Sequence, residues 1–120
     1  MRTALNRVLM TAAVATMISL SATYAPVVQA GAIEDGRKVA YDRKKGNCLA
    51  CHLIQGANLP GNIGPPLIAM KARFPDKAAL RAQIWDATVK NPNSMMPPFG
   101  KHGVLSEKDI DLVVDFIYSL

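Results

Sequence analysis

The chain is poor in the residues that most often build metal sites and disulfide frameworks. Its 120 residues include two cysteines and two histidines. A disulfide between Cys48 and Cys51 would close so short a loop that it would restrict the unfolded chain very little. A zinc site made from these cysteines and His52 needs a fourth ligand, and His102 is the only other imidazole. Both uses stay open as alternatives, but the disulfide leaves His52 without a role.

Strand patterns are also missing from the sequence. No segment reads convincingly as a strand, and no strand–helix–strand pattern surrounds the two cysteines, which argues against a thioredoxin-like redox pair. Basic and aromatic residues are not interleaved, which argues against nucleic-acid binding. No internal repeat or low-complexity segment is visible. The sequence therefore predicts an all-α domain without a nucleic-acid partner.

The first thirty residues have the pattern of an export signal. Arg2 and Arg7 give a positively charged start, residues 8–20 are apolar apart from Thr and Ser, and small residues precede a cut after Ala30. The apolar run is shorter than the ~20 residues that a membrane-spanning helix needs, so a retained anchor is the weaker alternative. We predict a cleaved signal peptide over residues 1–30, export to the periplasm and no membrane attachment afterwards.

The remaining segment, residues 31–120, is expected to form one small domain. Without Arg2 and Arg7 it holds 12 basic and 9 acidic residues, which gives a net charge of +3 with both histidines neutral. A domain of this size has a marginal apolar core of its own and commonly needs a covalent or metal staple.

The strongest motif in the chain is Cys48-Leu49-Ala50-Cys51-His52, which has the C-x-x-C-H pattern of covalent haem attachment. Two thiols three positions apart can each add across a vinyl group of the same haem. The histidine beside the second thiol can then bind the iron from the same face. The motif predicts one covalent haem c, attached to Cys48 and Cys51, with His52 as the proximal iron ligand. This haem would be the staple that the small domain needs.

Apolar periodicity predicts three helices, with loops rich in Gly and Pro between them. The expected helices cover about Ile33 to Lys45, about Asp76 to Lys90 and about Glu107 to Ser119. The last is the clearest, because Ser106 can cap its free amides and Asp109 can complete a capping box. Residues 56–66 and 91–103 are expected to be loops.

The iron position opposite the proximal histidine needs a ligand from elsewhere in the chain. Outside the signal peptide the methionines are Met70, Met95 and Met96. We predict Met96 as the distal ligand, because the loop 91–103 can fold over a haem edge without breaking regular structure. Met95 is the nearest alternative, followed by Met70 and His102. A Met/His pair raises the reduction potential, which favours electron transfer over oxygen chemistry.

Two further residues are candidates for supporting the haem. A ligating imidazole normally donates its second N–H to a fixed acceptor, and we expect the carbonyl oxygen of Pro65 to be that acceptor for His52. A plain loop turn is the alternative role for Pro65. Trp85, with Tyr118 or Phe116, can line the haem or bind a propionate, although simple core packing explains these aromatics equally well.

Taken together, these features resemble a class I cytochrome c. The shared pattern is an N-terminal helix with a glycine, C-x-x-C-H, a G-P-x-L turn, a helix with a tryptophan, an M-P-x-F-G loop and a final amphipathic helix. The resemblance implies a small all-α domain wrapped around one covalently attached haem c. It also implies that Gly36 lets the first helix cross the last one near an aromatic such as Tyr118. It further implies that the Pro65 carbonyl accepts from His52 and that Met96 is the distal ligand.

A narrower resemblance is carried by three stretches of the chain. They are Gly46-Asn47-Cys48-Leu49-Ala50-Cys51-His52, Gly61-Asn62-Ile63-Gly64-Pro65-Pro66-Leu67 and Asn91-Pro92-Asn93-Ser94-Met95-Met96-Pro97-Pro98-Phe99-Gly100-Lys101-His102. They are similar to the SoxX family, the monohaem subunit of the periplasmic SoxAX complex of thiosulfate-oxidising bacteria. The resemblance implies a SoxA-like cytochrome partner, the SoxYZ carrier protein as the substrate of the complex, and a downstream acceptor cytochrome.

The implied activity belongs to the complex, an L-cysteine S-thiosulfotransferase that couples thiosulfate oxidatively to a carrier cysteine. This chain would accept electrons and would hold no substrate-catalytic residue, because haem attachment leaves no free thiol for sulfur chemistry. The alternative function is that of a free-standing soluble class I cytochrome c that shuttles electrons between periplasmic redox enzymes.

Overall fold

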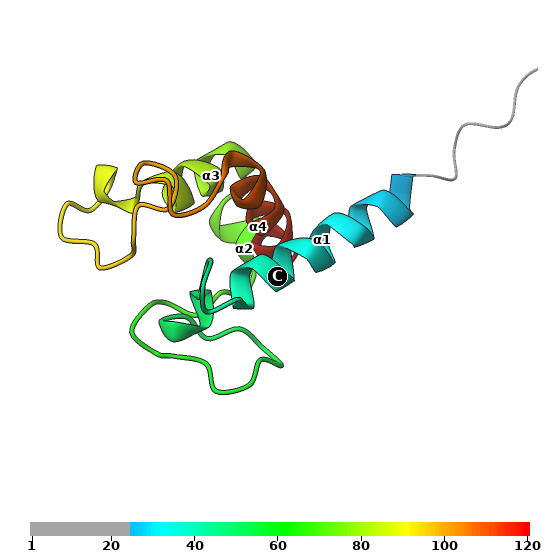
Figure 1. Cartoon of the computed structure of the whole chain (residues 1–120), viewed down its shortest axis with the longest axis horizontal. Helices are drawn as coiled ribbons and strands as arrows, with labels where there is room; N and C mark the ends of the chain where they lie inside the picture. The colour runs from blue at the N-terminus through cyan, green and yellow to red at the C-terminus, as the bar shows by residue number, and fades with distance from the viewer. Residues whose placement is uncertain (1–24) are drawn as a thin grey trace, which may run out of the picture.

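The computed structural model describes residues 25–120, which form helices and loops without a strand (Figure 1). In chain order the elements are α1 (Ala25–Tyr41), η1 (Cys48–Ala50), α2 (Met70–Arg73), α3 (Lys77–Trp85), η2 (Ala87–Val89) and α4 (Glu107–Ser119). The prediction of an all-α fold is confirmed. Most of the expected signal peptide, residues 1–30, lies outside the described residues. Within the described part, no helix has the length and apolar character needed to cross a membrane.

Helix α4 is the centre of the fold and has the predicted bounds. The Ser106 hydroxyl accepts a hydrogen bond from the backbone N–H of Asp109 at 3.1 Å, which satisfies one of the free amides at the helix start. The apolar stripe of this helix is buried, and its members are Ile110, Val113, Val114, Phe116 and Ile117. A local cap and a stripe of helical period are thus enough to specify this element.

Helix α1 crosses α4 at Gly36. A Cβ atom at Gly36 would lie 1.9 Å from the carbonyl oxygen of Leu112, so the two backbones can approach this closely only with glycine at the crossing. The aromatic pair beside the crossing is Tyr41 and Phe116, whose rings meet edge to face with centroids 5.8 Å apart. Tyr118, the expected aromatic, instead donates from its hydroxyl to the Pro75 carbonyl at 3.2 Å.

The predicted bounds of the first helix were wrong at both ends. Helix α1 starts at Ala25 and ends at Tyr41, four residues before Lys45. It ends there because Asp42 takes over as acceptor: its carboxylate accepts from the N–H of Lys44 at 2.8 Å. The carbonyl oxygen of Asp42 also accepts from the N–H groups of Lys45 and Asn47, both at 3.0 Å. The chain turns here instead of continuing as a helix.

The helix predicted over residues 76–90 is divided into two parts. Asp76 caps α3 by accepting from the N–H of Ala78 at 2.9 Å, as an aspartate before a helix can. The helix ends at Trp85 because Asp86 is extended, with φ −155°, and its carboxylate caps the short turn η2 instead. The four-residue helix α2 was not predicted.

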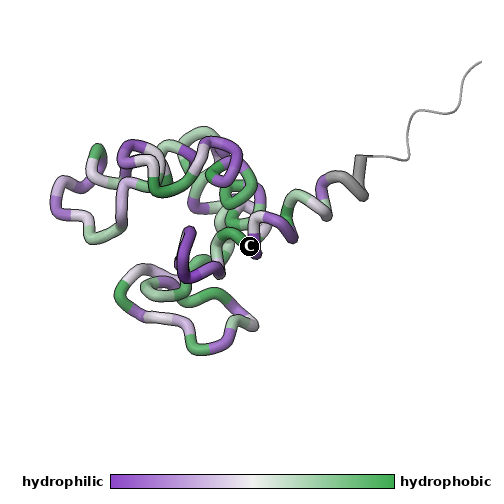
Figure 2. The backbone as a smooth tube through the Cα atoms, viewed as in Figure 1, coloured by the Kyte–Doolittle hydropathy of each residue, from purple (hydrophilic) through white to green (hydrophobic). Residues whose placement is uncertain are grey.

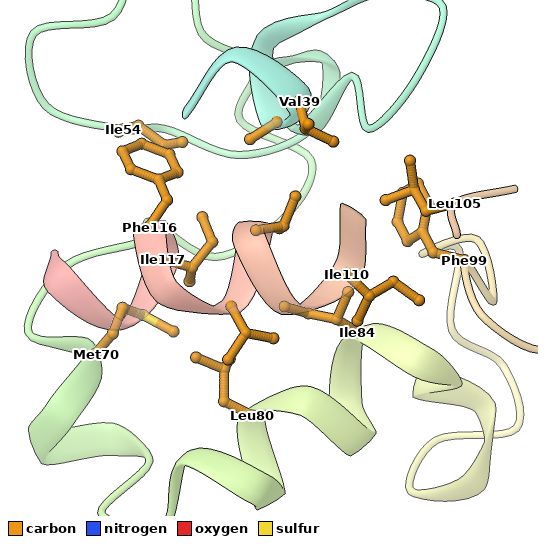
Figure 3. Close-up of a cluster of buried hydrophobic side chains, with 13 residues drawn as sticks. Val39, Ile54, Met70, Leu80, Ile84, Phe99, Leu105, Ile110, Phe116 and Ile117 are labelled. Carbon is orange, nitrogen blue, oxygen red and sulfur yellow. The ribbon is translucent and has the colours of Figure 1, made fainter. Parts of the chain in front are cut away.

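The apolar core lies on both sides of α4 (Figure 3). Val39 of α1 packs on one side, and Leu80 and Ile84 of α3 pack on the other. Phe99 and Leu105, from the long loop between η2 and α4, extend the core past the first turn of α4. This core fixes two loops, one around η1 and one before α4, in the positions from which they form the candidate site (Figure 1).

Candidate cofactor-binding site

The two cysteines are positioned by a tight turn after α1. Gly46 is buried and donates to the carbonyl oxygen of Val39 at 3.1 Å, and the next residue, Asn47, is left-handed with φ 46°. The short helix η1 follows, and the N–H of His52 reaches the carbonyl oxygen of Cys48 at 2.9 Å. One turn of helix therefore separates the thiols, and both line the same cavity.

A strap of residues 61–67 runs along the motif and is bonded to it at regular intervals. Its N–H groups at Gly61, Gly64 and Leu67 donate to the carbonyl oxygens of Leu49, Cys51 and Leu53, at 2.7, 2.7 and 2.9 Å. A Cβ atom at Gly61 would lie 2.2 Å from the carbonyl oxygen of Ala50. The glycines of the G-N-I-G-P-P-L stretch therefore allow the strap to lie directly against the C-x-x-C-H backbone.

The imidazole of His52 is held between two parts of this strap. Its Nδ1 lies 2.8 Å from the carbonyl oxygen of Pro65. A carbonyl can only accept, so Nδ1 carries the proton and Nε2 keeps a free lone pair for a metal. A Cβ atom at Gly64 would lie 2.6 to 3.1 Å from Cε1, Nδ1 and Nε2 of the ring. Glycine and proline together thus fix both the orientation and the tautomer of His52.

These residues form one wall of a cavity of about 730 Å³. The other walls come from α2, α3, α4 and the loop before α4, and the lining includes Cys48, Cys51, His52, Pro65, Leu67, Met70, Phe74, Leu80, Ile84, Met95, Met96, Phe99, Leu105, Val113 and Ile117. The volume is in the upper part of the usual range for ligand pockets, roughly 300–1,000 Å³. A mostly apolar wall with a few polar groups suits a large, flat, mostly apolar cofactor.

The four candidates for the distal ligand are in different environments. Met96 lines the cavity and packs against the apolar core, and its N–H donates to the Ser94 hydroxyl at 3.2 Å. Met95 also borders the cavity but is 80% exposed. Met70 is 2% exposed, and its sulfur accepts from Arg73 at 3.6 Å. His102 is exposed and does not line the cavity. Of the four, Met96 best combines a partly buried sulfur with access to the cavity.

The loop that carries Met96 is closed at its base by the end of α3. The N–H groups of Gly100 and Lys101 both donate to the carbonyl oxygen of Trp85, at 3.1 and 3.3 Å. Gly100 lies against the indole, since a Cβ atom there would be 2.1 Å from Cε3 of Trp85. The guanidinium of Arg81 lies over the same indole, 5.3 Å from the centre of the ring.

Of the two roles open for Trp85, haem contact and core packing, the structure shows packing. The indole holds Gly100, and the side chain does not line the cavity. Of the other two aromatics considered, Phe116 is in the α1–α4 core and Tyr118 bonds to Pro75. Neither lines the cavity.

An ion pair strengthens the same closure. The carboxylate of Asp86 is 6% exposed and lies 2.9 Å from Nζ of Lys101. Thr88 donates to this carboxylate from both its N–H and its hydroxyl. The hydrogen bond from Lys101, followed by those from Thr88, lowers the pKa of Asp86 to about 2. Asp86 is thus ionised at all ordinary pH values and connects the two ends of the Met96 loop.

Charges in the cavity wall have one sign. Besides the cysteines and His52, its ionisable residues are Arg43, Lys45 and Arg73, and no acidic residue lines it. Arg73 donates to the carbonyl oxygen of Pro66 at 2.6 Å, which joins α2 to the strap. Basic side chains at a cavity edge can pair with the carboxylates of a haem. Burial raises the pKa of the Cys48 thiol to about 11, so this sulfur is a neutral thiol at pH 7.

The residues present fit a haem in chemistry, and the cavity has the volume for a large cofactor. Two thiols, an imidazole with a free Nε2 and a thioether all line one apolar cavity. The sequence did not indicate Arg43, Arg73 or Asp86 as parts of the site. Asp86 had a local signal, because an aspartate two residues before a threonine often accepts from that residue's N–H. The two arginines had none, since their place at the cavity depends on tertiary structure.

Most of the chain matches a known protein family. Residues 31–117 match the family model described as cytochrome C oxidase, cbb3-type, subunit III. In Aquifex aeolicus (strain VF5), an uncharacterized lipoprotein is 34% identical to the chain over 76 residues. That alignment covers 62% of this chain and 37% of the lipoprotein, so the chain spans well under half the length of this relative.

Proposed function

Because the chain belongs to the cytochrome c family of cbb3-type cytochrome c oxidase subunit III, we propose that it transfers electrons through one covalently attached haem c. The observation that carries this proposal is the single cavity of about 730 Å³ that Cys48, Cys51, His52 and Met96 all line. A haem supplies one-electron redox chemistry when it is bound.

Each of the four residues has a distinct task. The thiols of Cys48 and Cys51 would hold the haem by adding across its vinyl groups, an addition that also takes up the thiol protons, so no oxidant would be required. Nε2 of His52 would bind the iron, and the Pro65 carbonyl holds the opposite ring nitrogen at 2.8 Å. The thioether of Met96 would be the second protein ligand, and a Met/His pair raises the reduction potential.

The proposed location is the periplasm, reached through a signal peptide over residues 1–30 that is cleaved after Ala30. Export and haem attachment are mutually consistent. Small exported domains commonly need a covalent or metal link to be stable, and a haem attached to C-x-x-C-H would provide one. The mature protein would then be residues 31–120, with no membrane attachment of its own.

We further propose that the chain is the SoxX subunit of a SoxAX complex. The three stretches at residues 46–52, 61–67 and 91–102 support this, since they resemble SoxX over the whole site. The chain would accept electrons while a SoxA-like cytochrome couples thiosulfate to a cysteine of SoxYZ, and would pass them to an acceptor cytochrome. The free-standing shuttle remains the alternative.

The haem proposal is tested on a denaturing gel stained for haem peroxidase activity, after export with a haem-attachment system. The wild-type band should stain, and Cys48→Ala with Cys51→Ala should abolish the stain. Met96→Leu should stain as the wild type does, because a distal ligand makes no covalent bond to haem. A wild-type band that stays dark, while protein staining detects it, contradicts covalent attachment.

Copurification separates the two finer functions. A SoxX subunit should elute from a sizing column together with a second cytochrome that mass spectrometry identifies as SoxA-like. A shuttle should elute alone at the size of one domain. Elution alone from its native periplasm would contradict the subunit proposal and leave the haem proposal intact.

A further inference from the structure

The loop that carries Met96 is joined to the rest of the molecule at few points. Within the described chain, residues 92–98 make no backbone hydrogen bond outside residues 91–105. Hydrophilic and apolar residues are mixed along this loop (Figure 2), and its buried side chains, Phe99 and Leu105, come after Met96 in the chain. The position of Met96 therefore depends on how firmly the base of the loop is held.

The base of the loop is bonded to one acceptor and rests on one side chain. The N–H groups of Gly100 and Lys101 both donate to the carbonyl oxygen of Trp85. A Cβ atom at Gly100 would also lie 2.2 Å from Cδ2 of the indole, so the loop backbone lies directly against the ring. Because Trp85 is only partly buried, packing in the core does not enclose this ring completely.

The second contact of the indole is with Arg81, one helical turn earlier in α3. Its guanidinium lies over the ring, 5.3 Å from the ring centre, which is an attractive cation–π arrangement. The guanidinium in turn is held by the first turns of α4. Its Nε donates to a carboxylate oxygen of Asp111 at 2.7 Å, and its Nη2 donates to Glu107 at 3.3 Å. Two bonds from different nitrogens of a planar group fix its orientation over the indole.

These contacts form a continuous series from α4 to the loop, through Asp111, Arg81, Trp85 and Gly100. None of these four residues lines the cavity. They act on the site only through the loop, in which Gly100 follows Met96 by four residues. The series also joins the two helices between which the loop runs, α3 and α4.

We propose that Arg81 is a positioning residue for Met96, which holds the loop closed through Trp85 and so limits the access of small external ligands to the position opposite His52. This inference rests on the proposed function, in which Met96 is the distal ligand of a covalent haem. An external ligand binds there only while the loop is open. Its apparent affinity is therefore proportional to the open fraction, and a loosened loop binds it more tightly.

The test is a titration of the oxidised holoprotein with imidazole, followed by the loss of the thioether-to-iron absorption. Arg81→Met keeps an unbranched apolar side chain beside the indole but removes both hydrogen bonds to α4. It should tighten imidazole binding by about three- to tenfold, because charged hydrogen bonds at a partly exposed site are lost. Asp111→Asn changes no residue in contact with the loop, and its effect should be smaller, about two- to threefold.

Arg37→Met is the matched control. Arg37 pairs with Glu34 at 2.7 Å and lies 5.4 Å from the ring centre of Tyr41, so the same kinds of contact are lost, but all of them within α1. The imidazole affinity should stay unchanged. Amide hydrogen exchange gives a second readout. The N–H groups of Gly100 and Lys101 should exchange faster in Arg81→Met and at the wild-type rate in Arg37→Met.

A purely structural role for Arg81 predicts a different result. Arg81→Met would then unfold at a lower urea concentration while its imidazole affinity and its exchange at Gly100 matched the wild type, which overturns the proposal. An equal tightening in Arg37→Met also overturns it, since any loss of stability would then open the loop. If Arg81→Met does not fold, Asp111→Asn decides, and an unchanged affinity in that variant overturns the proposal.

Failure of the proposed function gives a separate result. A wild-type protein that does not stain for haem contradicts covalent attachment, and a stained protein without the thioether-to-iron absorption contradicts Met96 as the ligand. Either result overturns the present proposal as well. Wild-type absorption together with an unchanged imidazole affinity in Arg81→Met overturns the role of Arg81 alone and leaves the electron-transfer function standing.

Discussion

His52 donates a hydrogen bond from Nδ1 to the carbonyl oxygen of Pro65 over 2.8 Å. The acceptor is a backbone atom, and the following Pro66 restricts the ψ of Pro65 that sets the direction of this carbonyl, so it cannot rotate away as a side-chain acceptor could. The bond therefore determines which imidazole nitrogen is free, and it holds the ring plane against the strap. As the proposed proximal ligand, His52 would keep its basicity and orientation through this hydrogen bond.

Gly64→Ala is predicted to disturb this arrangement directly. The new Cβ atom would lie 2.6 Å from Cε1 and 2.7 Å from Nδ1 of His52, so the strap or the ring must move. We expect a loss of about 1–3 kcal/mol in the free energy of unfolding of the holoprotein, measured with urea. Gly56→Asn is the control, because its side chain would meet open space and asparagine accepts a φ of 77°. Equal stability of Gly64→Ala and wild type would contradict the close contact.

Met96→Leu is predicted to remove the distal ligand while the covalent haem stays attached. The weak thioether-to-iron absorption near the red end of the visible spectrum should disappear, and the reduction potential should fall. Met95→Leu should keep both, because Met95 is 80% exposed whereas Met96 packs against the core. If Met95→Leu abolishes the absorption and Met96→Leu does not, the assignment of the sulfur is wrong.

Gly36→Ala is predicted to destabilise the crossing of α1 and α4. Its Cβ atom would lie 1.9 Å from a backbone oxygen, and backbone cannot step aside as a flexible side chain can. The expected loss is at least about 1–3 kcal/mol in the free energy of unfolding, despite the higher helix propensity of alanine. Lys38→Ala, two positions further along the same helix, changes only an exposed side chain and should alter the free energy of unfolding by about 0.5 kcal/mol or less. Similar effects at both positions would argue against the crossing.

The Asp86–Lys101 pair predicts a pH dependence at the acid end. The pKa of Asp86 is lowered to about 2 in the folded protein, so between pH 4 and 2 the unfolded chain binds more protons at this residue. The stabilisation is present above about pH 4, the ordinary range of a free aspartate, and is lost as the pH falls towards 2. The melting temperature of Asp86→Asn should therefore approach that of wild type as the pH falls from 5 to 2. A constant difference over that range would exclude Asp86 as the cause.

Lys101→Met tests the same pair from the other side. Lysine makes the largest contribution to the lowered pKa of Asp86, so its loss should shift the acid-dependent stability to higher pH. Because Lys101 also closes the Met96 loop, this variant should weaken the thioether-to-iron absorption. Lys108→Met, which removes an exposed lysine of α4 outside this loop, should do neither.

The parts of the molecule that could be predicted from the sequence are those with local causes. Helix α4 has the predicted bounds because a cap at Ser106 and an apolar stripe are written within fifteen residues. The end of α1 was misjudged because Asp42 captures amides that a helix would use, and propensity does not report such competition. The short helix α2 could not be predicted, since it follows a left-handed Ala69 whose N–H is bonded to Leu120 at the other end of the chain.

The residues of the candidate site also divide into those that the sequence indicates locally and those that depend on tertiary contacts. The C-x-x-C-H motif indicated its own chemistry, and the glycines of residues 61–64 had a backbone reason that only the structure makes visible. The role of Trp85 stayed open between haem contact and packing, because tryptophan suits a haem wall and a packing partner equally well. Only the tertiary contact with Gly100 distinguishes the two.

The two groups of residues that line the cavity also differ in their separation along the chain. The cysteines, His52 and Pro65 all fall within residues 48–65 and are joined by backbone hydrogen bonds over short separations. Met96 arrives on a separate loop that is closed only at its base, by Trp85, Asp86, Gly100 and Lys101. Short-range contacts form early in folding and long loops close later, so the half of the site around residues 48–65 is expected to assemble first, while the Met96 loop is still open. If the proposed function holds, the same asymmetry predicts that the Met96 loop is the unit that opens and recloses on its own, while a haem stays attached through Cys48 and Cys51.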